Sequence, residues 1–404
     1  MIEPLRGIRV VDLSRAIAGP YCTALLADMG AEIIKVESVN GGDSARAWPP
    51  FENEHSLYFE SLNRNKRSVC IDFYSAEGRD ILDRLIEGAD VLVENFKLGT
   101  LDKLGLTSEH LAELNPDLVV ASVTGFGSTG PLKDDPGLDQ VVQGMSGLMS
   151  VTGPPGSSYR VGVSIVDITS GMVSAFGIVS ALLGRARGKD VSRVSTSLLE
   201  TAMNLSVFQG QRALSLGEAP SAQGNNHPTI TPYGTFNTAT EPINIAVGNE
   251  KQWRAFCELL GLPDTVADPR FSTGPRRTTN RDELTGILEA VLATKPAAEW
   301  VPLITEANIP CGPIFDYTQA FASEQVTALG LVKDVRRQDG TTLPLVRGPL
   351  SVNGVASGIR SSPPLLGEHT AQILRELGIA DDAIDRLGAE GRVKVGADMT
   401  PVRR

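Results

Sequence analysis

The 404-residue sequence predicts an α/β fold built on a Rossmann-like, doubly wound parallel sheet, followed by a second, smaller unit. The first third of the chain alternates short β-branched runs with helical patterns, which is typical of a parallel sheet covered by crossover helices. Five such runs occur in order, and right-handed crossovers between them favour one doubly wound layer. A polar, proline-rich stretch over residues 217–232 then interrupts the pattern and indicates a domain boundary.

The elements of the first third follow from these patterns. We expect buried strands at residues 7–13, 31–37, 68–73, 90–95 and 118–123. Helices are expected at 19–29, at 76–87 and in a stretch that ends at Leu114. In the second of these helices, Ile81, Leu82, Leu85 and Ile86 fall at helical spacing behind a Ser75 cap.

The rest of the chain is less regular. A strand-like run at 161–166 leads into a helix at 169–185 that is rich in Gly, Ala and Ser, whose small side chains permit close packing. A strand at 243–247 and a helix at 252–260 begin the second unit, which ends near 310–313. From residue 335 onward we expect short strands, a turn at Pro363-Pro364 and a helix at 370–377.

Composition excludes several classes of protein. The chain has 37 basic and 48 acidic residues and a formal net charge of −11, which disfavours a nucleic-acid binder. Its four cysteines and four histidines are scattered, so neither a disulfide framework nor a metal site is expected. The N-terminus lacks the apolar core of a signal peptide, and no window reaches the ~18 apolar residues of a membrane span. We therefore expect a cytoplasmic protein with no membrane partner.

A glycine motif at residues 125–130 is a candidate for a dinucleotide-binding site. The segment reads G-x-G-x-x-G and follows a predicted strand, but a working fingerprint also opens a helix whose N-terminus meets the pyrophosphate. Here Pro131 and the polar residues after it continue a loop, so we expect no NAD. The chain also lacks a P-loop lysine and a G-x-S-x-G elbow.

Asp167 is the carboxylate that remains of interest. It follows the strand-like run at 161–166 and precedes the small-residue helix. One interpretation is a helix N-cap. The other is a nucleophile, because ligands collect at strand-loop-helix junctions and free N–H groups at the helix start could stabilise an oxyanion.

Basic residues form a second candidate feature. They occur at Arg64, Lys66 and Arg67 and again at Lys97 and Lys103. Such a cluster is usually a solvated face, but positive charge at strand ends could also hold the phosphates of an anionic cofactor.

Ordered blocks along nearly the whole chain resemble the family III CoA-transferases. The blocks are PLRGIRVVDL at 4–13, AGP at 18–20, GAEIIKVE at 30–37, GDSARAW at 42–48, NRNKRS at 63–68, VENF at 93–96, LDKLG at 101–105, IPCGP at 309–313 and PLLGEHT at 364–370. This family includes formyl-CoA:oxalate, carnitine and succinate-hydroxymethylglutarate CoA-transferases and the related α-methylacyl-CoA racemases. The resemblance implies a CoA-transferase.

The resemblance also implies a domain layout. A large Rossmann-like CoA-binding domain would span residues 1–216, a linker 217–232 and a smaller α+β domain 233–325, and residues 326–404 would return to the large domain. Two such subunits would thread through each other as interlocked rings, so we expect a homodimer.

Site residues follow from the same blocks. Asp167, in VDITSG at 166–171, stands where the transferases carry their nucleophile. It would form an acyl anhydride and then an aspartyl-CoA thioester, with coenzyme A carried in as acyl-CoA and no metal required. The resemblance places the following residues along the bound CoA: Ala16, Ile17, Asn63, Asn65, Lys66, Arg67, Asn95, Phe96, Lys97, Lys103 and Asp139.

Substrate choice remains more open. The chain reads Gly137-Leu138-Asp139 where racemases carry a histidine before the aspartate, so two-base exchange at Cα lacks one partner. The segment 224–233 resembles the dicarboxylate-using branch, and Asn226 and His227 could cover the acyl group, although a structural turn histidine is an equal alternative. Arg46 and Arg160 could bind a far carboxylate, or could lie on the surface, and the resemblance adds Trp48 to the substrate site.

We expect an acyl-CoA, such as succinyl-CoA, to donate CoA to a small carboxylic or dicarboxylic acid. A racemase or epimerase and a non-catalytic CoA-ester-binding paralogue remain the alternatives.

Overall fold

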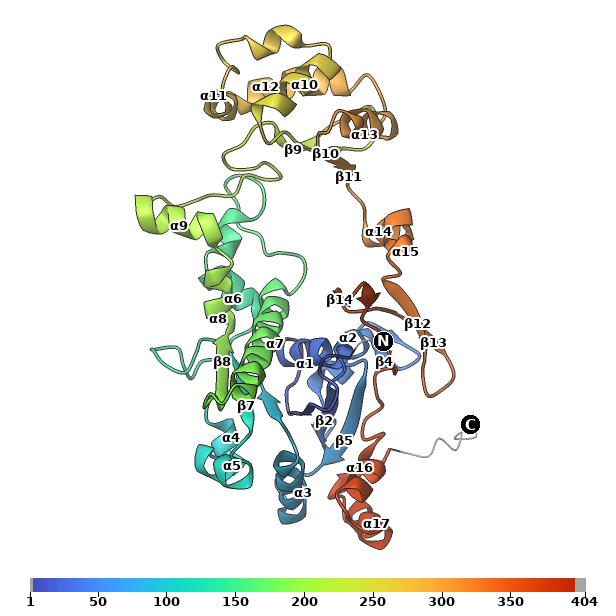
Figure 1. The fold of residues 1–404 in the computed structure, drawn as a ribbon. Coiled ribbons are helices and arrows are strands. Elements are labelled where there is room, and N and C mark those ends of the chain that lie inside the picture. Colours follow the sequence, from blue (N-terminus) through green and yellow to red (C-terminus); the bar gives the residue numbers. More distant parts are fainter. Residues whose placement is uncertain (1–2, 397–404) are drawn as a thin grey trace. The chain divides into compact units, whose positions relative to one another are not determined.

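The computed structural model describes residues 3–396 and divides them into two units (Figure 1). The large unit comprises residues 3–147, 161–211 and 327–396, and the second unit comprises 148–160 and 212–326. The segment 148–160 thus packs with the second unit, whereas the sequence had placed it in the large domain. Helices α9 (Val207–Leu216) and α15 (Glu324–Ala328) run across the two boundaries.

A seven-stranded sheet forms the centre of the large unit. Its order is β16 (Val393–Lys394), β5 (Lys66–Ile71), β2 (Glu32–Ser38), β1 (Arg9–Asp12), β6 (Val91–Glu94), β7 (Val119–Thr124) and β8 (Arg193–Ser197). Six strands are parallel, and β16 pairs antiparallel with β5 at one edge. In chain order the parallel strands run 3-2-1-4-5-6, the order of doubly wound Rossmann sheets. The predicted Rossmann-like sheet is therefore confirmed.

Helices cover both faces of this sheet (Figure 1). Because successive side chains of a strand point to opposite faces, Val10 packs on one face and Val11 on the other. The Val10 face is covered by α1 (Ala18–Asp28) and α7 (Ile165–Ala186). The Val11 face is covered by α3 (Ala76–Glu87), α5 (Ser108–Leu114), α16 (Thr370–Glu376) and α17 (Asp381–Ala389).

Helices α1 and α7 approach each other unusually closely. Ser170, Gly171 and Ser174 of α7 are buried, and a Cβ placed on Gly171 would lie 2.6 Å from the Ala18 carbonyl oxygen of α1. Only glycine fits there. By length and composition, α7 is the one helix among residues 3–396 that could cross a membrane, but here it packs against α1, β7 and β8.

The first-third strands and helices match the predictions within a few residues. α3 has the predicted bounds, and the Ser75 Oγ accepts a hydrogen bond from the Gly78 N–H at 3.0 Å. Edge strands β8 and β16 were not predicted. The strand at 161–166 is wrong, because α7 begins at Ile165 and residues 161–164 form a loop. The alternating Val161-Gly162-Val163-Ser164 pattern imitates a strand, but Gly162 and Val163 are exposed and pair with no neighbour.

Smaller elements complete the large unit. They are η1 (Ser44–Ala47), α2 (Leu57–Leu62), α4 (Thr100–Lys103), α6 (Asp139–Met145), α8 (Leu198–Asn204) and the hairpins β3–β4 (Phe51–Glu52, His55–Ser56), β12–β13 (Val332–Arg336, Thr342–Val346) and β14–β15 (Ser351–Val352, Val355–Ala356).

The second unit has its own sheet and core. Strands β9 (Tyr233–Phe236), β10 (Ile243–Ala246) and β11 (Cys311–Pro313) form an antiparallel sheet in the order β11-β10-β9. Trp253, Leu288 and Trp300 pack against it from three helices. The helices and 3₁₀ turns are η2 (Leu148–Val151), α10 (Glu250–Leu259), η3 (Pro263–Val266), α11 (Gly274–Thr279), α12 (Arg281–Leu292), α13 (Ala297–Glu306) and α14 (Tyr317–Ala322).

Candidate active site

Asp167 lies in the first turn of α7, as its third residue. It is therefore not the N-cap, which is Ser164, and the Ser164 side chain makes no capping hydrogen bond. Helix α7 connects β7 to the parallel strand β8, so its first turn lies at the carboxyl edge of the sheet, where ligands bind in doubly wound folds. The Asp167 side chain is half-buried. Burial, together with the nearby Asp139 carboxylate, raises the pKa of Asp167 to about 7.

Asp139, the first residue of α6, holds the start of α7. Its Oδ1 accepts hydrogen bonds from the N–H groups of Val166 at 2.9 Å and Asp167 at 3.3 Å. Its Oδ2 accepts from the Gln143 Nε2 at 2.6 Å, and the Gln143 Oε1 accepts from the Val161 N–H at 2.8 Å. Both side chains are buried. Asp139 and Gln143 therefore fix both ends of the loop that leads to Asp167.

These contacts correct the expected oxyanion site. The Ile165 N–H bonds the Val163 carbonyl at 2.8 Å, and the Ile168 N–H bonds the Ser164 carbonyl at 3.0 Å. With the next two N–H groups held by Asp139, the first turn of α7 has no free donor for an oxyanion. By contrast, no donor among residues 3–396 bonds the Asp167 carboxylate, which leaves its oxygens available to a substrate.

The loop between β1 and α1 carries Ala16 and Ile17 to the same edge. The Asn95 side chain, which follows β6, accepts from the Arg15 N–H and donates to the Arg15 carbonyl, each at 2.8 Å. The Arg15 guanidinium lies 5.2 Å from the centre of the Phe96 ring. Ala16 has a left-handed φ of 66°, and its N–H bonds the Asp43 Oδ1 at 3.0 Å. Gly171 packs on Ala18, so this loop and Asp167 sit at the starts of two touching helices.

Buried charged side chains contact that loop and support it. The Lys35 Nζ lies 2.9 Å from Asp43 and donates to the Ser14 carbonyl at 2.9 Å. Burial alone would raise the pKa of Asp12, but Lys66 and Lys35 outweigh it and lower that pKa. These side chains are closed off from solvent. The loop therefore rests on a paired network of charges that no single sequence motif revealed.

Asn63, Asn65 and Lys66, where CoA contacts were predicted, are buried and bonded within the chain. The Lys66 Nζ bonds Asp12, the Pro20 carbonyl and the Asn63 Oδ1. The Asn65 amide is occupied by Asp28 and the backbone of residues 358–361. All three side chains are less than 8% exposed, so they help to hold the fold together, and a CoA contact by any of them stays a prediction.

A CoA contact by Arg67 also stays a prediction. It stands at the amino end of β5, at the edge opposite the strands' carboxyl ends. Its guanidinium bonds Glu32 at 2.7 Å and Glu376 at 2.7 and 2.9 Å. It therefore joins α16 to the sheet.

Lys97 and Lys103 are exposed and make no ion pair within the described chain. Lys97 and Phe96 line a cavity of about 370 Å³ over the carboxyl ends of β6, β7 and β8, beside Glu94. Burial raises the pKa of Glu94, whose carboxylate accepts from the Phe96 N–H at 2.7 Å. Gly127, Ser128 and Thr129 of the glycine motif line the same cavity. As expected, that motif forms a loop and opens no helix.

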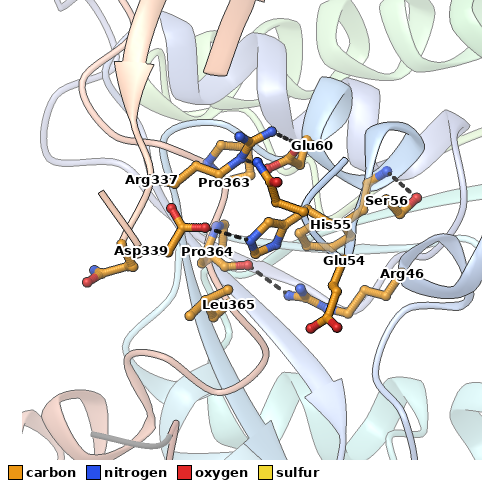
Figure 2. A pocket seen from close by; sticks show the side chains of 13 residues that line it. Arg46, Glu54, His55, Ser56, Glu60, Arg337, Asp339, Pro363, Pro364 and Leu365 are labelled. Carbon is orange, nitrogen blue, oxygen red and sulfur yellow. Dashed lines mark hydrogen bonds and ion pairs between the residues drawn. The ribbon is translucent and has the colours of Figure 1, made fainter. Parts of the chain in front are cut away.

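Arg46 is not a free cation. Its guanidinium bonds both Glu37 oxygens, at 2.8 and 2.7 Å, and the Pro364 carbonyl at 3.1 Å, and it stacks on the Phe59 ring. Arg46 lines a cavity of about 410 Å³. Figure 2 shows its guanidinium directed at Pro364, with the His55–Asp339 pair among the other lining side chains. Arg46 thus already has a carboxylate partner in Glu37, and a direct role in binding a substrate carboxylate stays a prediction. Trp48 meets Tyr58 edge to face at 5.6 Å.

Arg160, Asn226 and His227 belong to the second unit. Arg160 and Asn226 are exposed. The His227 Nδ1 accepts from the Thr229 and Ile230 N–H groups at 3.2 Å, and the His227 carbonyl accepts from Arg281 at 2.6 Å. Burial, helped by the Arg281 charge, lowers the pKa of His227. These contacts are those of a turn histidine, and a substrate role for the three residues stays a prediction.

The profile of the family described as CoA-transferase family III matches residues 5–370. The chain belongs to the family III CoA-transferases. A succinate–glutarate CoA-transferase of Agrobacterium fabrum is 40% identical over 93% of this chain and 96% of its own, and a mouse succinyl-CoA:glutarate CoA-transferase is 36% identical over 97% and 91%. A crystal structure of a CAIB/BAIF family protein from Brucella suis superposes with a TM-score of 0.82 at 38% identity, covering 93% of this chain and all of the other. The predicted family and enzyme class are confirmed: this CoA-transferase moves CoA from an acyl-CoA to a carboxylic acid.

Gln143 is the site residue that sequence reasoning missed. It is buried completely and holds Asp139 in place. The signal was present, because Asp139 and Gln143 stand four residues apart in a short helix and so share one face. The partners of the buried lysines had no such signal, since they lie on strands far apart in the chain.

Proposed function

We propose that this CoA-transferase takes CoA from succinyl-CoA and gives it to a dicarboxylic acid such as glutarate, with Asp167 as the nucleophile. The observation that carries the nucleophile is its environment: a half-buried carboxylate with unbonded oxygens, at the carboxyl edge of the sheet, with its pKa raised to about 7. The donor and acceptor rest on relatives named succinate–glutarate and succinyl-CoA:glutarate CoA-transferase.

The first half of the reaction moves CoA onto the enzyme. An Asp167 oxygen attacks the thioester carbonyl of succinyl-CoA, the C–S bond breaks, and CoA leaves as a thiolate. The product is a mixed anhydride. The thiolate then attacks the Asp167 carbonyl carbon, the anhydride C–O bond breaks, and succinate leaves. CoA is now joined to Asp167 as a thioester.

The second half reverses these steps on the acceptor. An acceptor carboxylate attacks the Asp167 carbonyl and expels the CoA thiolate, which gives a second anhydride. The thiolate attacks the acceptor-derived carbonyl, and Asp167 is released as a carboxylate. Each step exchanges one activated acyl group for another, so neither a metal nor an external energy source is required. Water must be excluded, because it would hydrolyse the anhydride.

The acyl-CoA is proposed to follow the carboxyl edge of the sheet. Ala16 and Ile17 would flank the pantetheine, and Asn95 supports that loop by its two bonds to Arg15. Phe96 and Lys97 open onto the adjacent cavity. The unpaired ammonium groups of Lys97 and Lys103 suit the CoA phosphates. Arg160, Asn226, His227 and Trp48 stay the candidates that the resemblance offers for the far carboxylate of the acid.

We also propose that the enzyme is a cytoplasmic homodimer with interlocked subunits. An apolar stripe on α7 supports a second copy. Its residues are Met172, Val173, Phe176, Val179 and Leu183, and Phe176 is 76% exposed. Exposed apolar patches of this kind mark interaction surfaces.

The decisive experiment is CoA exchange followed by mass spectrometry. Succinyl-CoA and glutarate should yield glutaryl-CoA with wild-type enzyme and none with Asp167→Asn. Hydroxylamine added during turnover should convert Asp167 alone into a hydroxamate, and an unmodified Asp167 would overturn the proposed nucleophile. Deuterium uptake at Cα without an acceptor acid would identify a racemase instead. Tight CoA binding with no exchange across a broad acid panel would identify a non-catalytic paralogue.

A further inference from the structure

The contacts between α6 and α7 suggest how the reactivity of Asp167 is set. We propose that Asp139 is a positioning residue for Asp167: fixed by Gln143, it caps α7 in place of Ser164 and holds an uncompensated negative charge beside the nucleophile. This inference rests on the proposed nucleophilic role of Asp167.

The cap is unusual in its source. A helix start is ordinarily capped by its own N-cap residue or by an acidic side chain of its first turn. Here the Ser164 hydroxyl makes no capping bond, and Asp139 takes the N–H groups of Val166 and Asp167 instead. Because α6 supplies the cap, the Asp167 carboxylate is released from that task. Its oxygens can point to a substrate.

The charge on Asp139 has no cation to cancel it. The three donors that reach its oxygens are two backbone N–H groups and the Gln143 amide, all of them neutral. Within residues 3–396, no lysine, arginine or histidine forms an ion pair with Asp139. The neighbouring elements add little: Asp12 on β1 pairs with Lys66 on β5, and Glu200 on α8 bonds the Ser197 hydroxyl. The field of Asp139 therefore acts directly on Asp167.

Acylation relieves that repulsion. As a free carboxylate, Asp167 carries a second negative charge close to a buried one, which raises the energy of the resting enzyme. In the anhydride and in the CoA thioester, Asp167 is neutral. Asp139 thus destabilises the free nucleophile relative to both covalent intermediates. It also makes the Asp167 carboxylate more basic, and hence a better nucleophile once ionised.

Asp139→Asn tests the charge while keeping an oxygen to accept the two N–H groups. Single-turnover formation of the Asp167 adduct from succinyl-CoA would be followed by intact-protein mass spectrometry between pH 5 and 9, a range chosen to bracket about 7. We expect the adduct to form about tenfold more slowly on the plateau, and the pH midpoint to fall by about one unit. The KM for succinyl-CoA should change by less than about twofold, since both Asp139 oxygens are buried against Gln143 and the α7 backbone; a larger rise in KM would instead support the CoA contact that the resemblance implies for Asp139.

Two further variants complete the design. Asp139→Glu keeps the negative charge. The pH midpoint of adduct formation should therefore stay near that of the wild type, even if the longer side chain slows adduct formation. Asp135→Asn makes the same chemical change at an exposed position of the preceding loop and should change neither midpoint nor rate.

The outcomes separate this inference from the proposed function. A wild-type enzyme that never acylates Asp167 would overturn the proposed function itself. A wild type that acylates normally, beside an Asp139→Asn variant with an unchanged pH midpoint and only a lower melting temperature, would overturn the positioning role and leave Asp139 a structural cap.

Discussion

The ammonium group of Lys66 lies 3.2 Å from the Asp12 carboxylate, and both side chains are closed off from solvent. Desolvation of both charges is costly, so the pair is stable only while each partner is present. Because Asp12 also accepts hydrogen bonds from Ser14 and Thr23, the pair fixes the base of the loop that carries Ala16 and Ile17. A structural salt bridge thus supports the loop that we propose flanks the pantetheine.

Lys66→Met should therefore be strongly destabilising. Removing one partner leaves Asp12 buried beside a single remaining cation, and we expect a loss of about 3–5 kcal/mol in the free energy of unfolding, measured by urea titration. Arg375→Met is the matched control, because its pair with Asp381 is exposed and should cost less than about 1 kcal/mol. Equal losses in the two variants would contradict the buried-pair argument.

Asn95→Ala should weaken acyl-CoA binding. It removes both side-chain bonds to the Arg15 backbone, each worth about 1 kcal/mol, and frees the loop between β1 and α1. We expect the KM for succinyl-CoA to rise about tenfold with a smaller change in kcat. Asn115→Ala is the control: Asn115 also bonds backbone carbonyls, at Ile86 and Ala89, but it precedes β7 at the opposite edge of the sheet. It should lower stability and leave KM unchanged.

The rate should depend on pH through Asp167. With its pKa raised to about 7, the carboxylate is mostly protonated below that pH, so the acylation rate should rise about tenfold per pH unit up to pH 7 and then level off. The raised pKa also means that the folded state binds the proton more tightly than the unfolded state. Stability is therefore lost as pH rises from about 4 to 7. Asp167→Asn should abolish exchange, and it should raise the free energy of unfolding at pH 8 but not at pH 4. An equal difference in unfolding free energy between variant and wild type at the two pH values would contradict the raised pKa.

Lys97→Ala and Lys103→Ala should each raise the KM for acyl-CoA about three- to tenfold at low ionic strength. Both lysines are exposed and unpaired in the described chain, so salt should weaken their attraction for the CoA phosphates. The measurement is KM against salt concentration, where the wild type should show a steeper dependence than either variant. Lys189→Ala, at an exposed position just before β8, should reproduce the wild-type slope.

Phe176→Glu should disrupt the proposed homodimer. It places a charge in the middle of the apolar stripe of α7, where Phe176 is 76% exposed. Light scattering after size exclusion should show the mass of one 42.9 kDa chain, against twice that mass for wild type. Tyr74→Glu alters an equally exposed aromatic residue away from the stripe (81% exposed) and should remain dimeric. A monomeric wild-type enzyme would contradict the proposed homodimer.

Local patterns in the sequence predicted much of this fold correctly. The helix at 76–87 carries both a complete apolar spacing and its own Ser75 cap, and it was placed to the residue. The run at 161–166 was misread because alternating β-branched residues also suit an extended loop. A strand and an extended loop differ in the partner of the Val161 N–H group. Here that partner is the Gln143 side chain, 18 residues away in the sequence, and not a neighbouring strand.

The resemblance to the family pointed to Asp167, Asn95 and Lys97, and the structure places all three at the carboxyl ends of the strands or in the first turn of α7. Their roles stay predictions. The internal partners of the basic residues could not be predicted, because burial and long-range pairing are not visible in a charge count. Lys66 bonds Asp12, 54 residues away, Arg67 bonds Glu376, 309 residues away, and Arg46 pairs with Glu37.

The contact of Gly171 with the Ala18 carbonyl fixes the distance between the starts of α1 and α7. Because no side chain separates α1 from α7 there, the spacing between the loop at Ala16 and the carboxylate of Asp167 is set by two backbones in van der Waals contact rather than by adjustable rotamers. The proposed nucleophile and the loop proposed to hold the pantetheine therefore belong to one rigid unit, and we expect differences in acid preference among such enzymes to arise in parts that lie outside it.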